Sequence, residues 1–203
     1  MPELALFPMF LKLNGRRCLV VGAGPLAESK IESLLGAGAQ VQVVAPEATP
    51  RVQALAATGK LEWLKRPFVS GDLEGAVLAV AATSSRETNQ AVFDACRQFR
   101  VLCNAVDDPE RCDFFYGAVV RRGPLQIAIS TGGASPGAAA RLRRELEEQF
   151  GPEYEAWLVY IAELRREILA AGLSPELRKA ELERLASRSS FEEFLASHAS
   201  ARE

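Results

Sequence analysis

The chain has 203 residues, 48% of them hydrophobic and 25% charged, so it can bury a core and is not intrinsically disordered. Its formal net charge of −2 excludes the broad cationic surface that non-specific nucleic-acid binding needs. No run of about 18 apolar residues occurs, and no basic residue precedes the first apolar segment, so we expect neither a membrane span nor a signal peptide.

The cysteine and histidine content bears on metal chemistry and on the compartment. The four cysteines, Cys18, Cys96, Cys103 and Cys112, show neither CxxC nor Cys/His metal spacing, and the only histidine is His198. Buried free thiols are typical of a reducing compartment. We therefore expect a cytoplasmic protein without a bound metal.

The first predicted elements are a hairpin turn at Asn14-Gly15 and the buried strand to which it leads. That strand begins the run CLVVGAGPLAESK at residues 18–30, in which a helical pattern over residues 25–35 follows at once. The result is G-x-G-x-x-A: Gly22 makes the tight turn, Gly24 leaves room for a pyrophosphate, and Ala27 lets helix and strand pack closely. The motif predicts dinucleotide binding at the start of the helix. A plain strand-to-helix turn in another α/β protein is the alternative.

Further strands and helices alternate along the next part of the chain. Gly36-Ala37-Gly38 is a signal for the end of the first helix. Ser84 and Glu87 form a capping box for a helix that runs to about residue 99. Apolar runs predict strands at residues 41–45, 61–64, 77–82 and 101–106. This alternation indicates an α/β fold with a parallel, doubly wound, Rossmann-like sheet.

The pattern changes after Asp113. Two apolar runs flank a turn at residues 121–124, which predicts a hairpin, and from the N-cap Ser135 and Pro136 onward the chain is helical. Two helices carry apolar stripes, formed by Ala139, Leu142, Leu146 and Phe150 and by Trp157, Ile161, Leu164 and Ile168. We expect an NAD-binding Rossmann domain (1–113), a hairpin and dimerisation segment (114–135), and a helical region (136–203) that lines the substrate and forms a dimer. An intramolecular helical bundle is the alternative.

The ends of the second and fourth strands supply candidate cofactor contacts. Glu47 comes one or two positions later than the acid that usually bonds the adenosine ribose, and Pro46 precedes it. Backbone groups at residues 45–47 are therefore expected to hold the cofactor. NAD is favoured over NADP because no arginine immediately follows this strand, although Arg51 is near. Thr83 is a further candidate contact; forming the start of a helix is its alternative role.

Two adjacent carboxylates, Asp107 and Asp108, follow the fifth strand at the same edge of the sheet. Beside a nicotinamide, a carboxylate can act as a general base or bind a metal. Turn formation is the alternative, because Asp before Pro commonly starts a loop. The later loop STGGASP at residues 130–136 could bind an anion at a helix N-terminus or serve as a hinge.

Taken together, several segments resemble a known family. They are FPMFLKLNGRRCLVVGAGPLAESK, VVAPE, AATSSRETNQ, CNAVDDPERCDFF and AISTGGASPGAAARLRRELE, in matching order and spacing over about residues 5–150. They resemble the siroheme synthase N-terminal module, whose members are precorrin-2 dehydrogenases and, in some cases, also sirohydrochlorin ferrochelatases. The chain is expected to be the stand-alone form, without the methyltransferase domain of some members.

The resemblance implies a function and assigns residues to it. The expected activity is NAD-dependent oxidation of precorrin-2 to sirohydrochlorin by a homodimer, with ferrous-iron insertion left open. A non-catalytic NAD-sensing module is the alternative. The family's catalytic aspartate corresponds to Asp107, and Thr131 corresponds to a hydroxyl that some members phosphorylate. The implied NAD contacts are Pro25, Leu26, Pro46 and Glu47, and candidate contacts to the polycarboxylate substrate are Arg111, Arg121, Arg122 and Arg141. The lack of a histidine near the site departs from some family members.

Overall fold

The computed structural model describes residues 6–199, which form two compact units. One unit spans Phe7–Tyr116, and the other consists of Leu6 and the chain from Gly117 onward. Among residues 6–199, no helix is both long enough and apolar enough to cross a membrane.

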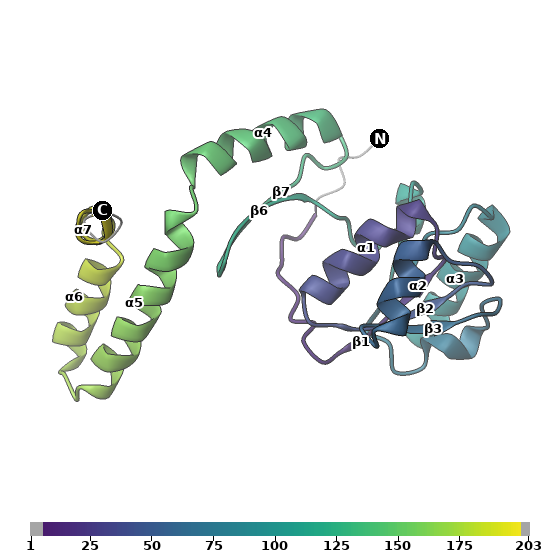
Figure 1. Cartoon of the computed structure of the whole chain (residues 1–203), viewed down its shortest axis with the longest axis horizontal. Coiled ribbons are helices and arrows are strands. Elements are labelled where there is room, and N and C mark those ends of the chain that lie inside the picture. The colour runs from purple at the N-terminus through teal and green to yellow at the C-terminus, as the bar shows by residue number, and fades with distance from the viewer. Residues whose placement is uncertain (1–5, 200–203) are drawn as a thin grey trace. The chain divides into compact units, whose positions relative to one another are not determined.

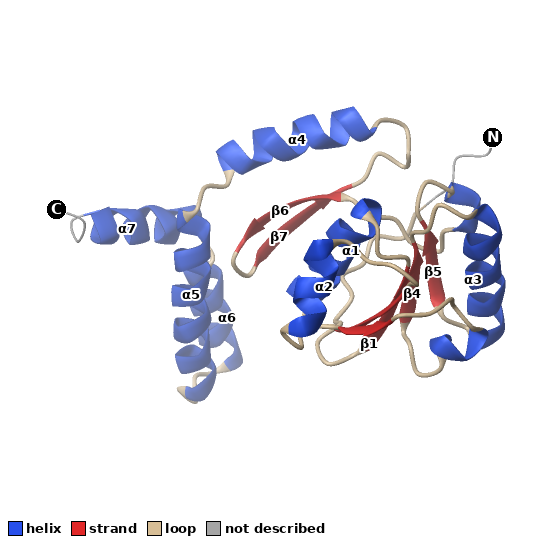
Figure 2. Cartoon of the chain, turned by 45° about the vertical axis from the view of Figure 1, so that its right-hand side comes forward, coloured by secondary structure: helices blue, strands red, loops and turns tan. Residues whose placement is uncertain are grey.

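The first unit is built on a five-stranded parallel sheet with strand order β3-β2-β1-β4-β5 (Figures 1 and 2). Its strands are β1 (Arg17–Val21), β2 (Gln40–Val44), β3 (Glu62–Leu64), β4 (Leu78–Ala81) and β5 (Leu102–Ala105). The central strands are buried on both faces, which is why they read as continuous apolar runs rather than alternating ones. Val21 pairs with Val44 on one side and with Ala81 on the other, so these strands end at one common edge. The expected Rossmann-like parallel sheet is confirmed.

Helices cover both faces of this sheet (Figure 2). Helices α1 (Pro25–Gly36) and α2 (Pro50–Ala57) lie on one face, and α3 (Arg86–Phe99) lies on the other. Short 3-10 helices occur at η1 (Ser70–Leu73) and η2 (Pro109–Arg111). α1 buries Ala27, Ile31 and Leu34, and fully burying one aliphatic side chain is worth about 1.5–3 kcal/mol. The sheet edge that carries Gly22 is thus held by a dry core on both sides.

Two local expectations need revision. The turn at Asn14-Gly15 forms, but the described residues before it make no strand, so the predicted hairpin is wrong. Instead, the N–H of Gly15 donates to the carbonyl of Gly38 at 2.9 Å, which ties the turn to the end of α1. In addition, α2 was not expected; only Val52 of this helix is buried, so its sequence has little apolar periodicity.

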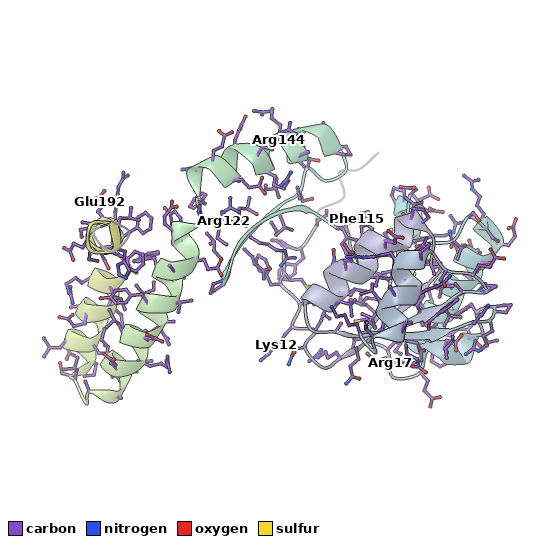
Figure 3. The ribbon with its side chains drawn as sticks, in the orientation of Figure 1. Lys12, Arg17, Phe115, Arg122, Arg144 and Glu192 are labelled. Atoms are coloured by element: carbon purple, nitrogen blue, oxygen red, sulfur yellow. The ribbon has the colours of Figure 1, made fainter. Side chains whose placement is uncertain are left out.

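The second unit begins with the expected hairpin, β6 (Ala118–Arg122) and β7 (Leu125–Ile129), which turns at Gly123 with φ +54°. Four helices follow: α4 (Pro136–Gln149), α5 (Glu153–Ala170), α6 (Pro175–Leu185) and α7 (Arg188–Ala199). Arg122, labelled in Figure 3, donates to the carbonyls of Glu147 and Phe150 at 2.9 and 2.8 Å. A cation at this place satisfies carbonyls that the end of α4 leaves free.

The apolar stripe of α5 packs in part against α7 of the same chain. The ring of Phe191 on α7 lies 5.1 Å from that of Trp157 and 4.5 Å from that of Tyr154. Trp157, Ile161, Leu164 and Ile168 are nevertheless only half-buried. Intramolecular packing therefore accounts for part of this stripe.

Candidate functional site

The turn between β1 and α1 has the geometry that the glycine motif predicts. Gly22 has φ +103°, and a methyl group built on it would lie 2.7 Å from the carbonyl carbon of Ala82 and 3.1 Å from the nitrogen of Thr83. Gly24 is the N-cap of α1, and nothing lies within 4 Å of a methyl group built there. Gly22 is thus required by the packing of the sheet, whereas Gly24 keeps open a space that the chain itself does not fill.

The start of α1 offers a hydrogen-bond donor to that open space. The carbonyl of Gly24 accepts from the N–H groups of Ala27 and Glu28, but the N–H of Leu26 has no acceptor among residues 6–199. No side chain of the described residues caps this helix, and Leu26 is 59% exposed. A free N–H and the positive end of the helix dipole at an open position suit a phosphate group.

A cavity of about 910 Å³ lies along this edge of the sheet. That volume falls within the range of about 300–1,000 Å³ that is typical of small-molecule and cofactor sites. The cavity brings together all seven expected cofactor residues: Gly22, Gly24, Pro25, Leu26, Pro46, Glu47 and Thr83. Within residues 6–199, its lining contains two carboxylates, those of Glu47 and Glu87, and no lysine or arginine.

Some lining residues were not expected from the sequence. Pro67 and Phe68, after β3, line the cavity and supply an apolar wall. Ser84 and Ser85, after β4, line it as well. Phe68 carried no signal because it lies outside any periodic pattern and follows a strand of only three residues. A site formed where four loops meet is hard to find from spacing alone.

The capping residue of α3 is Ser85, not Ser84 as the sequence suggested. The Ser85 hydroxyl accepts from the N–H of Thr88 at 3.0 Å and donates to the Glu87 carboxylate at 2.9 Å. A bond from its own backbone N–H and the one from Ser85 hold the pKa of Glu87 below its ordinary value. Glu87 is thus an anion at a helix N-terminus on the cavity wall. The S-x-x-E spacing fits Ser84 and Glu87 but not Ser85, whose third following residue is Thr88, so the capping-box pattern selected the wrong one of two adjacent serines.

Arg51 is the arginine nearest in sequence to the end of β2. Its Nε and Nη2 donate to one oxygen of Glu32 on α1, at 3.0 and 2.8 Å. Thr49, which lies between the end of β2 and Arg51 in the sequence, caps α2. Its N–H donates to the carbonyl of Ala23 at 3.0 Å. Arg51 therefore pairs with a carboxylate on the surface of α1 and does not line the cavity.

Asp107 lies in the loop after β5, at the same edge of the sheet, but it is not among the residues that line the cavity. β5 runs beside β4, and the N–H of Val106 donates to the carbonyl of Ala81 at 2.9 Å. The loops that carry Thr83 and Asp107 therefore start side by side. Asp107 is exposed and has φ +63°, a conformation that Asp and Asn adopt more readily than most residues.

Hydrogen bonds connect the residues at the start of this loop with those at its end. The side chain of the buried Asn104 donates to the carbonyl of Phe114 at 2.8 Å, and the carboxylate of Asp113 accepts from the N–H of Cys103 at 2.9 Å. The thiol of Cys112 lies 3.2 Å from the carbonyl of Ala105, and burial raises its pKa. The exposed Asp107 thus stands on a loop with a fixed base, as a catalytic group requires.

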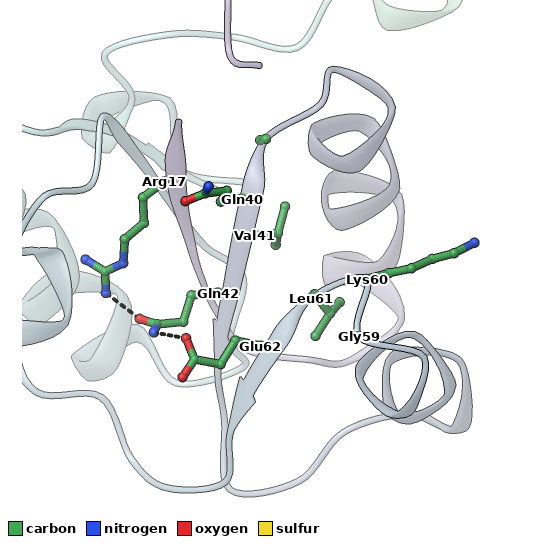
Figure 4. A pocket seen from close by; sticks show the side chains of 9 residues that line it. Arg17, Gln40, Val41, Gln42, Gly59, Lys60, Leu61 and Glu62 are labelled. Atoms are coloured by element: carbon green, nitrogen blue, oxygen red, sulfur yellow. Dashed lines mark hydrogen bonds between the residues drawn. The ribbon is translucent and has the colours of Figure 1, made fainter. Parts of the chain in front are cut away.

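A smaller cavity, of about 300 Å³, lies at the opposite edge of the sheet, near the start of β2 and β3 (Figure 4). Arg17 donates to Gln42 at 2.5 Å, and Gln42 donates to Glu62 at 2.6 Å. Figure 4 shows that the side chain of Lys60 extends away from this chain of contacts. Its polar groups satisfy one another, so this cavity has a structural explanation.

Comparison with known protein families shows to which family this chain belongs. The model of a family described as putative NAD(P)-binding matches residues 9–118, which is more than half of the chain. The chain belongs to this family. A second model, described as sirohaem biosynthesis protein central, matches residues 122–149. The expected resemblance to the siroheme synthase N-terminal module is confirmed.

Relatives and solved structures agree with this family. The chain is 41% identical over 178 residues to siroheme synthase 3 of Aeromonas hydrophila, covering 88% of this chain and 38% of the relative. It is 44% identical over 141 residues to the siroheme synthase of Chromobacterium violaceum, covering 70% and 30%. The chain thus spans about a third of the length of these curated relatives. The solved structure of SirC, precorrin-2 dehydrogenase, matches with a TM-score of 0.77 and 27% identity over 95% of this chain and 98% of that one.

Three of the four arginines that the siroheme synthase resemblance suggested as substrate contacts form hydrogen bonds or ion pairs within the chain. Arg111 pairs with Asp108 and donates to Gln90 at 2.5 Å. Arg122 caps α4, and Arg141 pairs with Glu145. Arg121 is exposed and makes no side-chain hydrogen bond or ion pair within residues 6–199. Of the four, only Arg121 presents an uncommitted guanidinium in the part of the chain that is described.

The loop at residues 130–136 acts locally as the start of α4. The Ser135 hydroxyl accepts from the N–H of Ala138 at 3.1 Å, as expected for an N-cap. The Thr131 hydroxyl lies 3.2 Å from both the N–H and the carbonyl of Ser135. Among residues 6–199, no group of three or more His, Cys, Asp or Glu side chains could hold a metal ion.

Proposed function

We propose that this chain catalyses the NAD-dependent oxidation of precorrin-2 to sirohydrochlorin. One observation carries the proposal: the cavity at the glycine turn, in a chain of which 95% matches the fold of a precorrin-2 dehydrogenase. The free N–H of Leu26 and the open space at Gly24 fit a pyrophosphate, and the cavity volume fits a dinucleotide.

The reaction removes a hydride and a proton from the macrocycle. NAD, when bound, accepts the hydride at its nicotinamide ring. The proton needs a base, and Asp107, which the siroheme synthase resemblance makes the catalytic aspartate, is an exposed carboxylate at the sheet edge where the cavity lies. We assign Asp107 to accept that proton, a role that typically contributes about 10²–10⁴ in rate.

We propose NAD rather than NADP as the cofactor. A 2′-phosphate next to Glu47 would meet a like charge, and the part of the lining that the described residues form offers no cation to compensate it. Arg51, which could have met that phosphate, is paired with Glu32. Gly22, Gly24, Pro25, Leu26, Pro46, Glu47 and Thr83 are the residues that we assign to the cofactor.

Assembly and compartment belong to the same proposal. We assign the chain to the cytoplasm, because three of its four cysteines are buried free thiols. We assign it to a homodimer, because a two-stranded hairpin is marginal alone and α5 exposes Val159 and Tyr160. Light scattering behind a sizing column tests the dimer; the mass of one chain at micromolar concentration would contradict it.

An anaerobic assay with precorrin-2 and NAD tests the proposed activity. The expected result is NADH together with the absorption spectrum of sirohydrochlorin, only when NAD is present. Binding of NAD without turnover would favour the NAD-sensing alternative. Repeating the assay with sirohydrochlorin and ferrous iron, without NAD, tests iron insertion separately, with Asp107→Asn as the matched variant.

A further inference from the structure

Asn89 is a polar side chain on the sheet-facing stripe of α3. It comes three and seven residues before Val92 and Cys96, which are both fully buried against the sheet. Helical periodicity therefore favours an apolar residue at position 89. An amide is tolerated at such a position only when hydrogen bonds compensate its loss of water.

All the hydrogen bonds of this amide go to one residue, Thr83, on the wall of the large cavity. Its Oδ1 accepts from the Thr83 N–H at 3.2 Å and from the Thr83 hydroxyl at 2.7 Å. Its Nδ2 donates to the Thr83 carbonyl at 3.1 Å. The Thr83 hydroxyl also accepts from the N–H of Ser85 at 3.2 Å. Every polar group of Thr83 therefore has a partner within the chain.

Thr83 in turn adjoins the glycine turn. The N–H of Ala82 donates to the carbonyl of Val21 at 2.8 Å, which joins the end of β4 to the end of β1. A methyl group on Gly22 would lie only 3.1 Å from the nitrogen of Thr83. A shift of Thr83 would therefore move the surface on which the glycine turn rests.

We propose that Asn89 is a positioning residue for the dinucleotide, which fixes Thr83 and so sets the spacing between the glycine turn and the loop after β4. Thr83 then contributes shape to the cavity rather than a hydrogen bond to the cofactor. This inference rests on the proposed function only in that the cavity binds NAD.

The variant Asn89→Asp tests this role with little change in size. It keeps the Oδ1 acceptor but sets an oxygen against the Thr83 carbonyl in place of the Nδ2 donor. The dissociation constant for NAD, measured by calorimetry, is expected to rise about tenfold or more, as loss of about 1.4 kcal/mol requires. The change should appear in Kd and KM for NAD more than in kcat. Gln98→Ala, an exposed amide on the same helix, is the matched control and should bind NAD like the wild type.

The variant Asn89→Leu separates positioning from folding stability. An apolar side chain suits the stripe of α3, so thermal stability should fall by less than in Asn89→Ala, while the Kd for NAD should rise as in Asn89→Asp. Wild-type Kd in both Asn89→Asp and Asn89→Leu would overturn the inference. A wild-type chain that binds NAD but does not oxidise precorrin-2 would overturn the proposed reaction and leave this test intact.

Discussion

The two glycines of the turn after β1 should fail in different ways when each is replaced by alanine. In Gly22→Ala the new methyl would lie 2.7 Å from the Ala82 carbonyl carbon, about 1 Å inside the usual contact distance of about 3.5–4.0 Å. A side chain at φ +103° costs roughly 1–3 kcal/mol, and overpacking costs about as much again. The total of roughly 2–6 kcal/mol is a large part of the 5–15 kcal/mol that typically stabilises a domain.

In Gly24→Ala the new methyl meets no atom within 4 Å, and the residue has φ −82°. The change costs no more than the weaker N-cap preference of alanine, about 1 kcal/mol. The methyl instead occupies the space left for the pyrophosphate, so NAD binding should fall while folding stability is kept.

Urea denaturation and NAD calorimetry on both variants measure the two effects. Gly22→Ala should unfold at a clearly lower urea concentration than the wild type. Its thermal unfolding midpoint should also be lower, by at least about 8 °C. Gly24→Ala should unfold like the wild type but bind NAD at least about tenfold more weakly. Equal stability of Gly22→Ala and wild type, or wild-type NAD affinity in Gly24→Ala, would refute the reasoning.

Three further results are expected. Asp107→Asn, which suits the positive φ, should lower kcat at least about 100-fold while the Kd for NAD stays within twofold; near wild-type turnover would remove Asp107 from the mechanism. Burial raises the pKa of Asp72, but hydrogen bonds from Arg66 and Val69 outweigh it and hold the pKa below its usual 3.8. The stability this carboxylate adds is present above pH 3.8 and is lost as the pH falls through the lowered native pKa, so urea denaturation of Asp72→Asn should show a flatter acid dependence. Near neutral pH a thiol reagent should modify Cys112 alone in the native state, because Cys18, Cys96 and Cys103 are buried and Cys112 is only half-buried, and all four cysteines in urea; rapid native labelling of several thiols would contradict this.

The sheet could be predicted from the sequence because parallel strands buried on both faces give continuous apolar runs. The run that ends at Gly22, and the glycine motif after it, gave both the strand and the place of the cavity. α2 was missed because only Val52 of that helix is buried, so its periodicity is weak. Asn14-Gly15 suggested a hairpin, yet its backbone bonds to Gly38 instead of a neighbouring strand. Turn residues determine a local conformation, not the partner of the flanking chain.

The candidate site was predictable in part for a similar reason. Pro46, Glu47 and Thr83 follow strand ends, and parallel strands bring their carboxyl ends to one edge. Asn89 gave no signal, because a single amide on a helix resembles a surface residue until its partner is known. The arginines were harder still. Arg111, Arg122 and Arg141 suit carboxylate recognition by type, but each is engaged by a partner that only the fold brings near.

The stoichiometry of the anaerobic reaction tests the central claim most directly. With excess precorrin-2 and NAD, the account predicts one NADH for each sirohydrochlorin formed. It also predicts almost no product from Asp107→Asn at saturating NAD, and at most about a fifth of the wild-type rate from Gly24→Ala at an NAD concentration near the wild-type Kd, as a Kd raised about tenfold requires. Sirohydrochlorin formed by the wild type without NADH, or at the same rate without NAD, would contradict a hydride transfer at the cavity beside Gly22.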